Sequence, residues 1–282
     1  MAKFKIGELS KLLNIPETTI RYYDKMGIVD SHKNNHSGYR VFNEVDMHNL
    51  MHYKLYRSYG LNQKQAQQCI YDLNLDEIDQ VLSEDEQDIA RQIRFLTEKQ
   101  RIVQAKRQFI EALDHQLGTL QVIERKACCL IGYRQRNGGQ TALIQKKENY
   151  DILSDWMERF PLVSMTPYFL ESDFRSQLEQ EYSGLIVEKK IAEEFNLICD
   201  ERVMELPPAR CISYVFHRQK AMTVPFIRYM EPVFQYLDEH QYEVCGTVTF
   251  DHYIALKKHS EHLFYGRVLV PFRSINTPAS TL

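Results

Sequence analysis

The sequence predicts an α+β protein made of several domains, and three observations along the chain support this. A short segment with two helical patterns opens the chain, a long heptad pattern follows, and an aromatic-rich region of alternating strand and helix patterns completes it. A length of 282 residues is enough for two domains and a connector. We therefore expect three parts, at residues 1–74, 75–120 and 121–282.

The first part begins with the pattern of two short helices joined by a turn. Asn14 and Ile15 make the turn, and Pro16 suits the first position of a helix because no amide partner is needed there. Apolar residues at helical spacing give the first helix one buried face: Ile6, Leu9, Leu12 and Leu13. Hydroxyl, guanidinium, ammonium and phenol groups cover the second: Thr18, Thr19, Arg21, Tyr22, Tyr23 and Lys25. Such a helix suits the major groove of DNA.

A polar loop, Ser31 to Tyr39, follows these helices and returns through a glycine. Gly38 can turn the chain there, so that Tyr39 and Arg40 project from a small wing and contact phosphate. The segment IGELSKLLNIPETTIRYYDKMGI followed by SGYRVF resembles the winged helix-turn-helix of the MerR family of transcription regulators. The resemblance covers roughly the first 70 residues and implies a DNA-binding domain.

Two further helices complete the first part. The third is expected from Asn43, a suitable N-cap with Asp46 three residues later, to about Tyr59, where Gly60 ends it. The fourth is expected at residues 62–72. The resemblance places Arg57 at a position where relatives contact phosphate, so we include it among the candidate DNA-binding residues.

A sustained heptad pattern predicts a long helix in the second part. No Gly or Pro interrupts Ser83 to Gln116, and Ser83 with Glu86 forms a capping-box pattern that would start a helix about 50 Å long. A second stripe contains Phe95, Ile102 and Phe109. Six apolar residues fall at seven-residue spacing: Leu82, Ile89, Leu96, Val103, Ile110 and Leu117. This pattern favours a coiled coil, and the resemblance implies an antiparallel one that forms a homodimer on a pseudo-palindromic operator.

The charge distribution fits DNA binding better than the net charge of −3 does. Residues 1–74 contain ten Lys or Arg against seven Asp or Glu, a balance of +3, which a dimer would use twice. The chain has no long apolar run and no signal-peptide pattern, so we expect a cytoplasmic protein without a membrane partner. In that compartment the six cysteines are expected as free thiols.

The third part contains two similar passages. One begins near Leu130-Ile131-Gly132-Tyr133 and the other near Cys211-Ile212-Ser213-Tyr214. We expect helices near residues 150–159 and 226–240, followed by strands near 164–171, 185–194, 246–256 and 263–272. This repeated β-α-β-β pattern is typical of an α+β domain with a pseudo-twofold groove. It resembles the GyrI-like effector-binding domain of BmrR-type multidrug sensors in the MerR family.

The resemblance implies a ligand site around an acidic residue. Asp251, in the strand GTVTFDHY, takes that position if one residue is inserted, although the usual residue is Glu. In a regular strand Thr247, Thr249, Asp251 and Tyr253 share a face. Other aromatic residues near pocket positions of the family are Tyr150, Tyr168, Phe226, Tyr229, Phe264 and Tyr265. A carboxylate ringed by aromatics suits lipophilic cations.

These observations predict a ligand-responsive regulator, not an enzyme, with no cofactor. Its partners would be double-stranded promoter DNA, RNA polymerase at the promoter, a small-molecule effector and a second copy of the chain, and by resemblance it would activate transcription by distorting the promoter. A non-cationic ligand is one alternative. A metal or redox sensor is another, but Cys128 and Cys129 are adjacent and would point to opposite faces of a strand. A hydrolase using Asp251, Tyr253 and Glu171 is a third, without a nucleophile-His-acid set.

Overall fold

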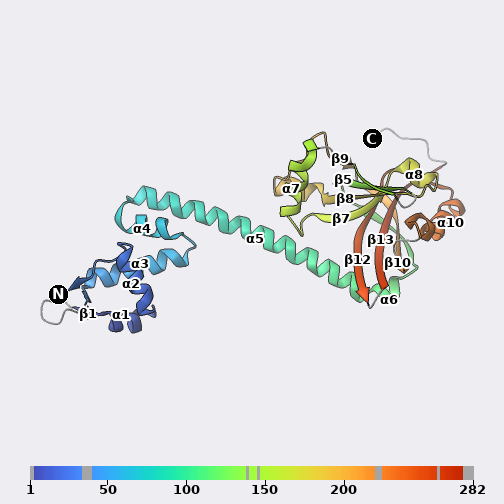
Figure 1. Ribbon diagram of the computed structural model, residues 1–282. Coiled ribbons are helices and arrows are strands. Elements are labelled where there is room, and N and C mark those ends of the chain that lie inside the picture. The colour runs from blue at the N-terminus through green and yellow to red at the C-terminus, as the bar shows by residue number, and fades with distance from the viewer. Residues whose placement is uncertain are drawn as a thin grey trace. The chain divides into compact units, whose positions relative to one another are not determined.

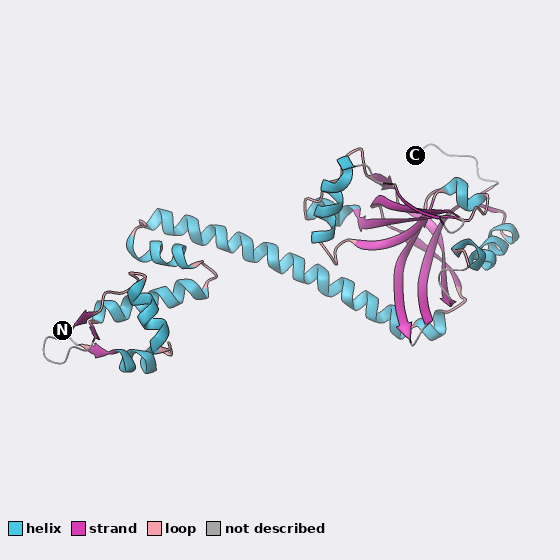
Figure 2. Ribbon diagram, viewed as in Figure 1, coloured by secondary structure: helices cyan, strands magenta, loops and turns pink. Residues whose placement is uncertain are grey.

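The structure combines helices and sheets in two compact units, Met1–Leu96 and Thr97–Leu282. This computed structural model describes residues 3–33, 40–137, 140–144, 147–219, 224–258 and 261–275. Figures 1 and 2 show a mainly helical N-terminal unit and a sheet-rich C-terminal unit. The division falls within the long helix α5 (Leu75–Glu111). The three-part division at residues 74 and 120 therefore stays a prediction.

The N-terminal unit contains the predicted helix pair and the strands of a wing. Helices α1 (Ile6–Leu13) and α2 (Glu17–Lys25) are joined at Asn14, whose φ of 50° is left-handed. Pro16 is the N-cap of α2 and not its first helical residue. Residues 34–39, including Gly38 and Tyr39, lie outside the described residues. A small antiparallel sheet has the order β1-β3-β2, formed by Phe4–Lys5, Arg40–Phe42 and His32–Lys33.

Two more helices support this pair, as predicted. Helix α3 (Glu44–Ser58) begins at the expected N-cap, because the Asp46 amide donates to Asn43 Oδ1 at 2.9 Å. Helix α4 (Gln63–Tyr71) follows after Gly60. The buried core of the helix pair comes from α1, α2, β3, α3 and the adjoining segments: Leu9, Leu13, Ile15, Ile20, Val29, Phe42 and Leu50. Helix α2 packs its apolar side, with Ile20, against α1, so most of its polar side chains stay exposed on the opposite side.

Helix α5 starts at Leu75, eight residues earlier than the Ser83 capping pattern predicts. The actual start is capped by Asn74, whose amide donates to Glu77 Oε2 at 2.8 Å while the Glu77 amide donates back at 3.0 Å. Ser83 therefore lies inside a continuous helix. Four residues of the heptad stripe are 45–58% exposed: Ile89, Leu96, Val103 and Ile110. The coiled coil stays a prediction.

The second stripe of α5 has a different environment from the first. Phe109 is only 4% exposed, and its ring stacks on His252 with centroids 4.5 Å apart. The end of α5 therefore packs on the sheet of its own C-terminal unit. A short helix α6 (Leu113–Gln116) and Gly118, with φ of 76°, lead from α5 into this sheet.

The C-terminal unit contains a ten-stranded antiparallel sheet. Its main path has the order β4-β10-β13-β12-β7-β8-β5-β6, with β9 on β5 and β11 on β13. In chain order, the strands are β4 (Leu120–Arg125), β5 (Cys128–Asn137), β6 (Gln140–Leu143), β7 (Ser164–Phe169), β8 (Gln180–Glu188), β9 (Met204–Leu206), β10 (Ala209–Gln219), β11 (Tyr242–Val244), β12 (Val248–Lys258) and β13 (Glu261–Ser274).

Helices and 3-10 turns connect these strands. The predicted strand-helix-strand-strand order is only approximate, because α8 separates β7 from β8 in the first passage and three strands follow α10 in the second. The predicted strand at 185–194 is wrong beyond Glu188, where α9 begins. Ile191 and Ala192 are both buried, and a strand would send such neighbours to opposite faces. The connecting elements are η1 (Lys147–Asn149), α7 (Tyr150–Glu158), α8 (Glu171–Arg175), α9 (Lys189–Glu194), η2 (Phe226–Met230) and α10 (Glu231–Glu239).

The two faces of β12 and β13 have different roles. Phe250, Val268 and Val270 face a buried core that also contains Val233 and Leu237 of α10. The alternate residues therefore point to the other face, where α5 lies beside the sheet. The register between β12 and β13 shifts between Phe250 and His252, so Asp251 is the extra residue of a β-bulge. Within the described residues, no helix is long and apolar enough to cross a membrane.

Candidate functional site

The outer face of α2 presents the predicted DNA-reading side chains. Thr18, Arg21, Tyr22 and Lys25 are exposed and follow helical spacing, so they share one face. Ile20, on the opposite side, is fully buried. The same burial that fixes α2 on α1 therefore keeps its polar face accessible.

The basic groups near this face form ion pairs with carboxylates of α2. Arg21 pairs with Glu17 at 3.4 Å with both side chains about half exposed. Arg40 Nε lies 3.2 Å from Asp24, and Asp24 also accepts a hydrogen bond from the Ser31 hydroxyl at 2.8 Å. Asp24 thus connects α2 to β3 through Arg40 and to the start of β2 through Ser31. The Arg21–Glu17 pair is exposed on both sides and contributes little to stability, whereas the Asp24 side chain is only 12% exposed.

The other predicted DNA-binding residues differ in how accessible they are. Thr19 is half-buried, and Tyr23 is half-buried with its ring 4.8 Å from that of Tyr53, which gives Tyr23 a packing role. Arg57 donates a hydrogen bond to the Leu61 carbonyl, so its guanidinium closes the turn between α3 and α4. The proposed phosphate contact of Arg57 stays a prediction.

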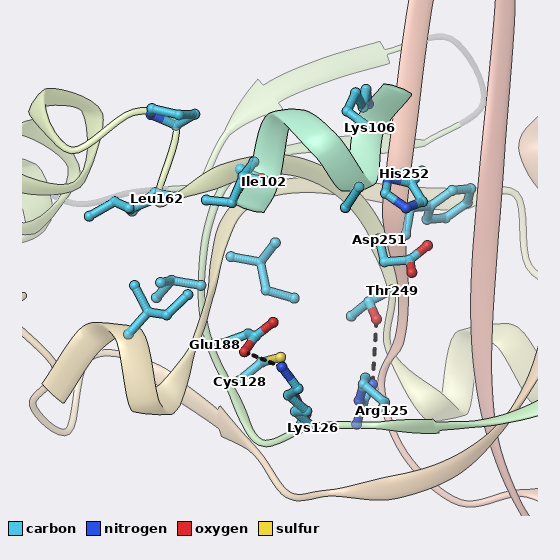
Figure 3. Close-up of a pocket in the computed structure, with 18 of the residues that line it drawn as sticks. Ile102, Lys106, Arg125, Lys126, Cys128, Leu162, Glu188, Thr249, Asp251 and His252 are labelled. Carbon is cyan, nitrogen blue, oxygen red and sulfur yellow. Dashed lines mark hydrogen bonds and ion pairs between the residues drawn. The ribbon is translucent and has the colours of Figure 1, made fainter. Parts of the chain in front are cut away.

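The C-terminal unit contains a cavity of about 740 Å³ between the end of α5 and the sheet. Ile102 and Lys106 of α5 line one side, and Thr249, Asp251 and His252 of β12 line another (Figure 3). Apolar groups form much of the remaining wall, including Ile123, Leu162, Val163, Ile186 and Leu269. The volume lies in the range of small-molecule sites.

Asp251 lines this pocket, but the predicted aromatic cage does not surround it. None of the other predicted ligand residues whose side chains the structure describes is part of the lining. Tyr150 is exposed, Phe264 is half-buried, and Phe226 lies in the core with 3% of its surface exposed. The other three pack against rings outside the pocket. Tyr168 stacks on Tyr182, the ring centroid of Tyr229 is 6.3 Å from that of Phe216, and the ring centroid of Tyr265 is 6.2 Å from that of His217.

The bulge at Asp251 is the physical reason for part of this difference. In a regular strand, side chains alternate between the two faces, which predicted a shared face for Asp251 and Tyr253. The extra residue of the bulge interrupts this alternation. His252 lines the pocket together with Asp251. The side chain of Tyr253 is outside the described part of the structure.

The acidic groups of the pocket are already paired with basic ones. Asp251 accepts hydrogen bonds from Arg267 Nε at 2.8 and 3.0 Å. Glu188 contacts Lys126 at 2.8 Å and Arg101 at 3.3 Å. The carboxylate on which the cation prediction rests is therefore occupied by a guanidinium of the protein itself.

Arg125, at the end of β4, was not predicted as a site residue and is 6% exposed in the pocket wall. It donates to the carbonyl of Thr247 at 2.9 Å and of Pro207 at 3.4 Å, and to the hydroxyl of Thr249 at 3.5 Å. Within the described part of the chain, its Nε has no hydrogen-bond partner. Nothing in the local sequence marks Arg125, since its burial depends on strands far away along the chain.

Burial shifts the pKa of three other pocket groups. It lowers the pKa of His252 to about 4, so the ring is neutral at pH 7. Burial also lowers the pKa of the Lys106 ammonium, an effect that Asp251 opposes. The pKa of the Cys128 thiol is raised to about 11 by burial, which keeps it protonated and unreactive at neutral pH.

Two of the alternative functions, a metal or redox sensor and a hydrolase, require particular side chains to lie close together. Among the described residues, no group of three or more His, Cys, Asp and Glu side chains is placed to hold a metal ion. Glu171 pairs with Arg175 at 3.2 Å and does not line the pocket with Asp251.

The comparisons with known proteins identify the class of the N-terminal region. Residues 5–42 match the MerR family regulatory protein model. The Mercuric resistance operon regulatory protein of Bacillus cereus is 27% identical over 75 residues, which are 27% of this chain and 57% of that protein. The chain thus spans little more than half the length of this curated relative. The N-terminal region of the chain is thus similar to MerR family regulatory proteins.

Several solved structures are similar at low identity. The EcmrR-DNA complex in EcmrR-RPo is 15% identical, covers 96% of this chain and 100% of that one, and has a TM-score of 0.35. HiNmlR, a MerR family regulator lacking the sensor domain and bound to promoter DNA, is 19% identical over 40% of this chain and 90% of that one, with a TM-score of 0.31. SAV2435 bound to tetraphenylphosphonium is 14% identical over 54% and 93%, with a TM-score of 0.27. At such TM-scores they do not establish the fold or ligand of this chain.

Proposed function

We propose that this chain is a homodimeric transcription regulator of the MerR type, controlled by a lipophilic small molecule. In each protomer α2 enters the major groove of one half of a pseudo-palindromic promoter site, and the regulator acts on RNA polymerase bound there. The C-terminal unit is the effector-binding part, with the role expected from its resemblance to GyrI-like domains. Ligand binding changes the DNA shape that the dimer favours and thereby activates transcription.

One observation carries this proposal: α5 is both a wall of the pocket and the first helix after the DNA-binding elements. Ile102 and Lys106 line the pocket, and the same uninterrupted helix begins at Leu75 in the N-terminal unit. A ligand that contacts α5 more favourably in one protein state shifts the population toward that state. Because helix residues move together, that shift reaches the N-terminal unit without a separate relay.

The exposed heptad stripe supports the dimer. Ile89, Leu96, Val103 and Ile110 repeat every seven residues and are about half exposed in one protomer. A stripe of this kind is stabilised when a second helix covers it. We infer an antiparallel coiled coil, which the resemblance implies, and the +3 balance of residues 1–74 is then present twice on DNA.

The apolar wall supports a lipophilic ligand, whereas its charge is a separate question. A lipophilic cation attracted by Asp251, as the sequence predicts, must first displace Arg267 from that carboxylate. A neutral or anionic lipophile needs no such exchange. The pairing of Asp251 therefore favours the non-cationic alternative over the cationic one.

The proposal is tested by separating ligand response from DNA affinity. An operator is first selected from a random pool of duplexes, and a panel of lipophilic anions, cations and neutral compounds is screened by thermal shift. Ile102→Trp fills the pocket from the α5 side, so we expect the ligand-induced change in transcription to be lost while operator affinity is retained. Gln104→Trp, on an exposed position of the same helix, is the matched control. A full ligand response by Ile102→Trp would refute the pocket assignment.

A further inference from the structure

The lining of the pocket contains more basic than acidic side chains. Five basic residues line it, Arg101, Lys106, Arg125, Lys126 and Arg267, against three acidic ones, Glu124, Glu188 and Asp251. His252 does not add to the positive charge, because its buried ring stays neutral at pH 7. Arg101 also pairs with Glu98, which does not line the pocket, so the cavity is modestly positive before any ligand enters it.

None of the three acidic side chains is left to balance this surplus. Asp251 is engaged by Arg267, and Glu188 is shared between Lys126 and Arg101. Glu124 is exposed, and its carboxylate lies 3.9 Å from the guanidinium of Arg210, a residue that does not line the pocket. A cationic ligand would therefore enter a positive cavity without a carboxylate to receive it.

Among these basic groups, Arg125 has the environment best suited to bind an anion. All of its hydrogen bonds go to neutral acceptors, the Thr247 and Pro207 carbonyls and the Thr249 hydroxyl. Among the described residues, no carboxylate forms an ion pair with it, and its Nε has no hydrogen-bond partner. A buried charge without a counter-charge is unfavourable, and an anion that supplies one is correspondingly stabilised.

The neutral acceptors hold the Arg125 guanidinium in place without neutralising it. They tie the end of β4 to β12 and to the segment before β10, so the planar donor group is oriented before a ligand arrives. Guanidinium groups held in this way suit planar oxyanions such as carboxylates. Figure 3 shows Arg125 next to Thr249, with Ile102 and Lys106 of α5 on another side of the cavity.

We propose that the pocket selects amphiphilic anions, with the oxyanion held by Arg125 and the apolar body against the α5 wall. This inference rests on the proposed function, since it names the class of ligand for the same pocket. Ile102, Ile123, Leu162 and Leu269 contact the apolar body, and Lys106 adds positive charge from the helix. The ligand then bridges the sheet and α5, as the proposed control of α5 requires.

The test compares three probes that share one alkyl chain: dodecanoate, 1-dodecanol and dodecyltrimethylammonium. Binding to the full chain is measured by calorimetry, below the concentrations at which the probes aggregate. We expect dodecanoate to bind about ten to a hundred times more tightly than the other two, as a charge-assisted hydrogen bond predicts. Equal binding of the three, or preference for the cation, would overturn the inference but leave a lipophile-responsive regulator intact.

Two variants assign the preference to Arg125. Arg125→Gln is expected to weaken dodecanoate binding about tenfold or more and leave 1-dodecanol binding unchanged. Arg228→Gln, which changes an exposed cation that pairs with Glu179 and does not line the pocket, is the matched control and should retain the preference. If Arg125→Gln fails to fold, Arg125→Lys keeps the charge but loses the planar donors and should show a reduced preference. Unchanged dodecanoate affinity in a folded Arg125 variant would refute its role.

Discussion

The outer face of α2 and the pocket beside α5 both present basic side chains, but they hold them in opposite ways. Arg21 on α2 is about half exposed, and its partner Glu17 lies one helical turn away. Arg125 in the pocket is buried, and its partners are on segments far along the chain. Water screens the first group and leaves the second unscreened. Removal of a charge from α2 should therefore alter DNA affinity alone. Removal of a charge from the pocket should alter both ligand affinity and the free energy of unfolding.

The largest effect is expected for Arg21→Ala on DNA affinity. Loss of one base or phosphate contact in each half-site weakens binding by about 1–3 kcal/mol per protomer, so a dimer loses up to twice that. The free energy of unfolding should change by less than about 0.5 kcal/mol, because the Arg21–Glu17 pair is exposed. Gel shifts on the selected operator and chemical denaturation measure the two quantities.

Arg91→Ala is the matched control, since it removes an exposed arginine that pairs with Asp88 on α5, away from α2. It should leave operator affinity nearly unchanged. Equal losses in the two variants would mean that α2 has no special role and that only net charge matters.

An intermediate effect is expected for Arg267→Met, which leaves Asp251 without its guanidinium. The unpaired, half-buried carboxylate should lower the free energy of unfolding by about 2 kcal/mol. Affinity for a lipophilic cation such as tetraphenylphosphonium should rise at the same time, because the carboxylate becomes available. Urea denaturation and calorimetry provide the readouts.

Arg210→Met, whose exposed partner Glu124 lies 3.9 Å away, is the control on a neighbouring strand and should change neither quantity. If Arg267→Met gains no affinity for the cation, Asp251 is not a cation site even when it is unpaired.

The smallest effect concerns the dependence of stability on pH through His252. Burial lowers its pKa in the folded chain to about 4 from an ordinary value of 6.5. Between these two values only the unfolded chain takes up the proton, so the free energy of unfolding falls as the pH is lowered from 6.5 toward 4. From pH 7 to pH 5 we expect this single group to contribute a loss of about 1–2 kcal/mol.

His252→Phe keeps a ring against Phe109 but removes the titration, so its stability should fall less over this range of pH. His240→Phe, at an exposed position after α10, is the comparison variant and should behave like the native chain. Parallel pH profiles for His252→Phe and the native chain would show that the environment of His252 is not responsible.

The helix pair and the elements around it were predictable because their signals are local. The Asn43–Asp46 cap, the turn at Asn14 and the apolar face of α1 each depend on residues within one or two helical turns. The structure contains the cap, the turn and a buried face with Leu9 and Leu13, but the prediction for Leu12 was wrong, since its side chain is 64% exposed. The start of α5 was misplaced because Ser83 with Glu86 and Asn74 with Glu77 both fit a capping pattern. A local rule does not choose between them.

The pocket was predicted only through Asp251, because its other features depend on distant residues. A one-residue bulge changes which side chains follow Asp251 into the cavity, and no local pattern in the strand marks the bulge. The aromatic residues at family-like positions pack elsewhere: Phe226 in the core under α10, and Tyr168 against Tyr182. Hydrophobicity predicts that such rings are buried, but not which surface they bury.

The sequence by itself determined the helix pair with its polar outer face, the heptad stripe and the repeated strand and helix order. These follow from periodicity and capping, which act over a few residues. Only the tertiary structure decided which charges meet: it pairs Asp251 with Arg267 and joins Arg125 to Thr249, 124 residues away. Electrostatic energy depends on distance and burial in space, so the charge that the pocket prefers is a property of the folded sheet and helix together.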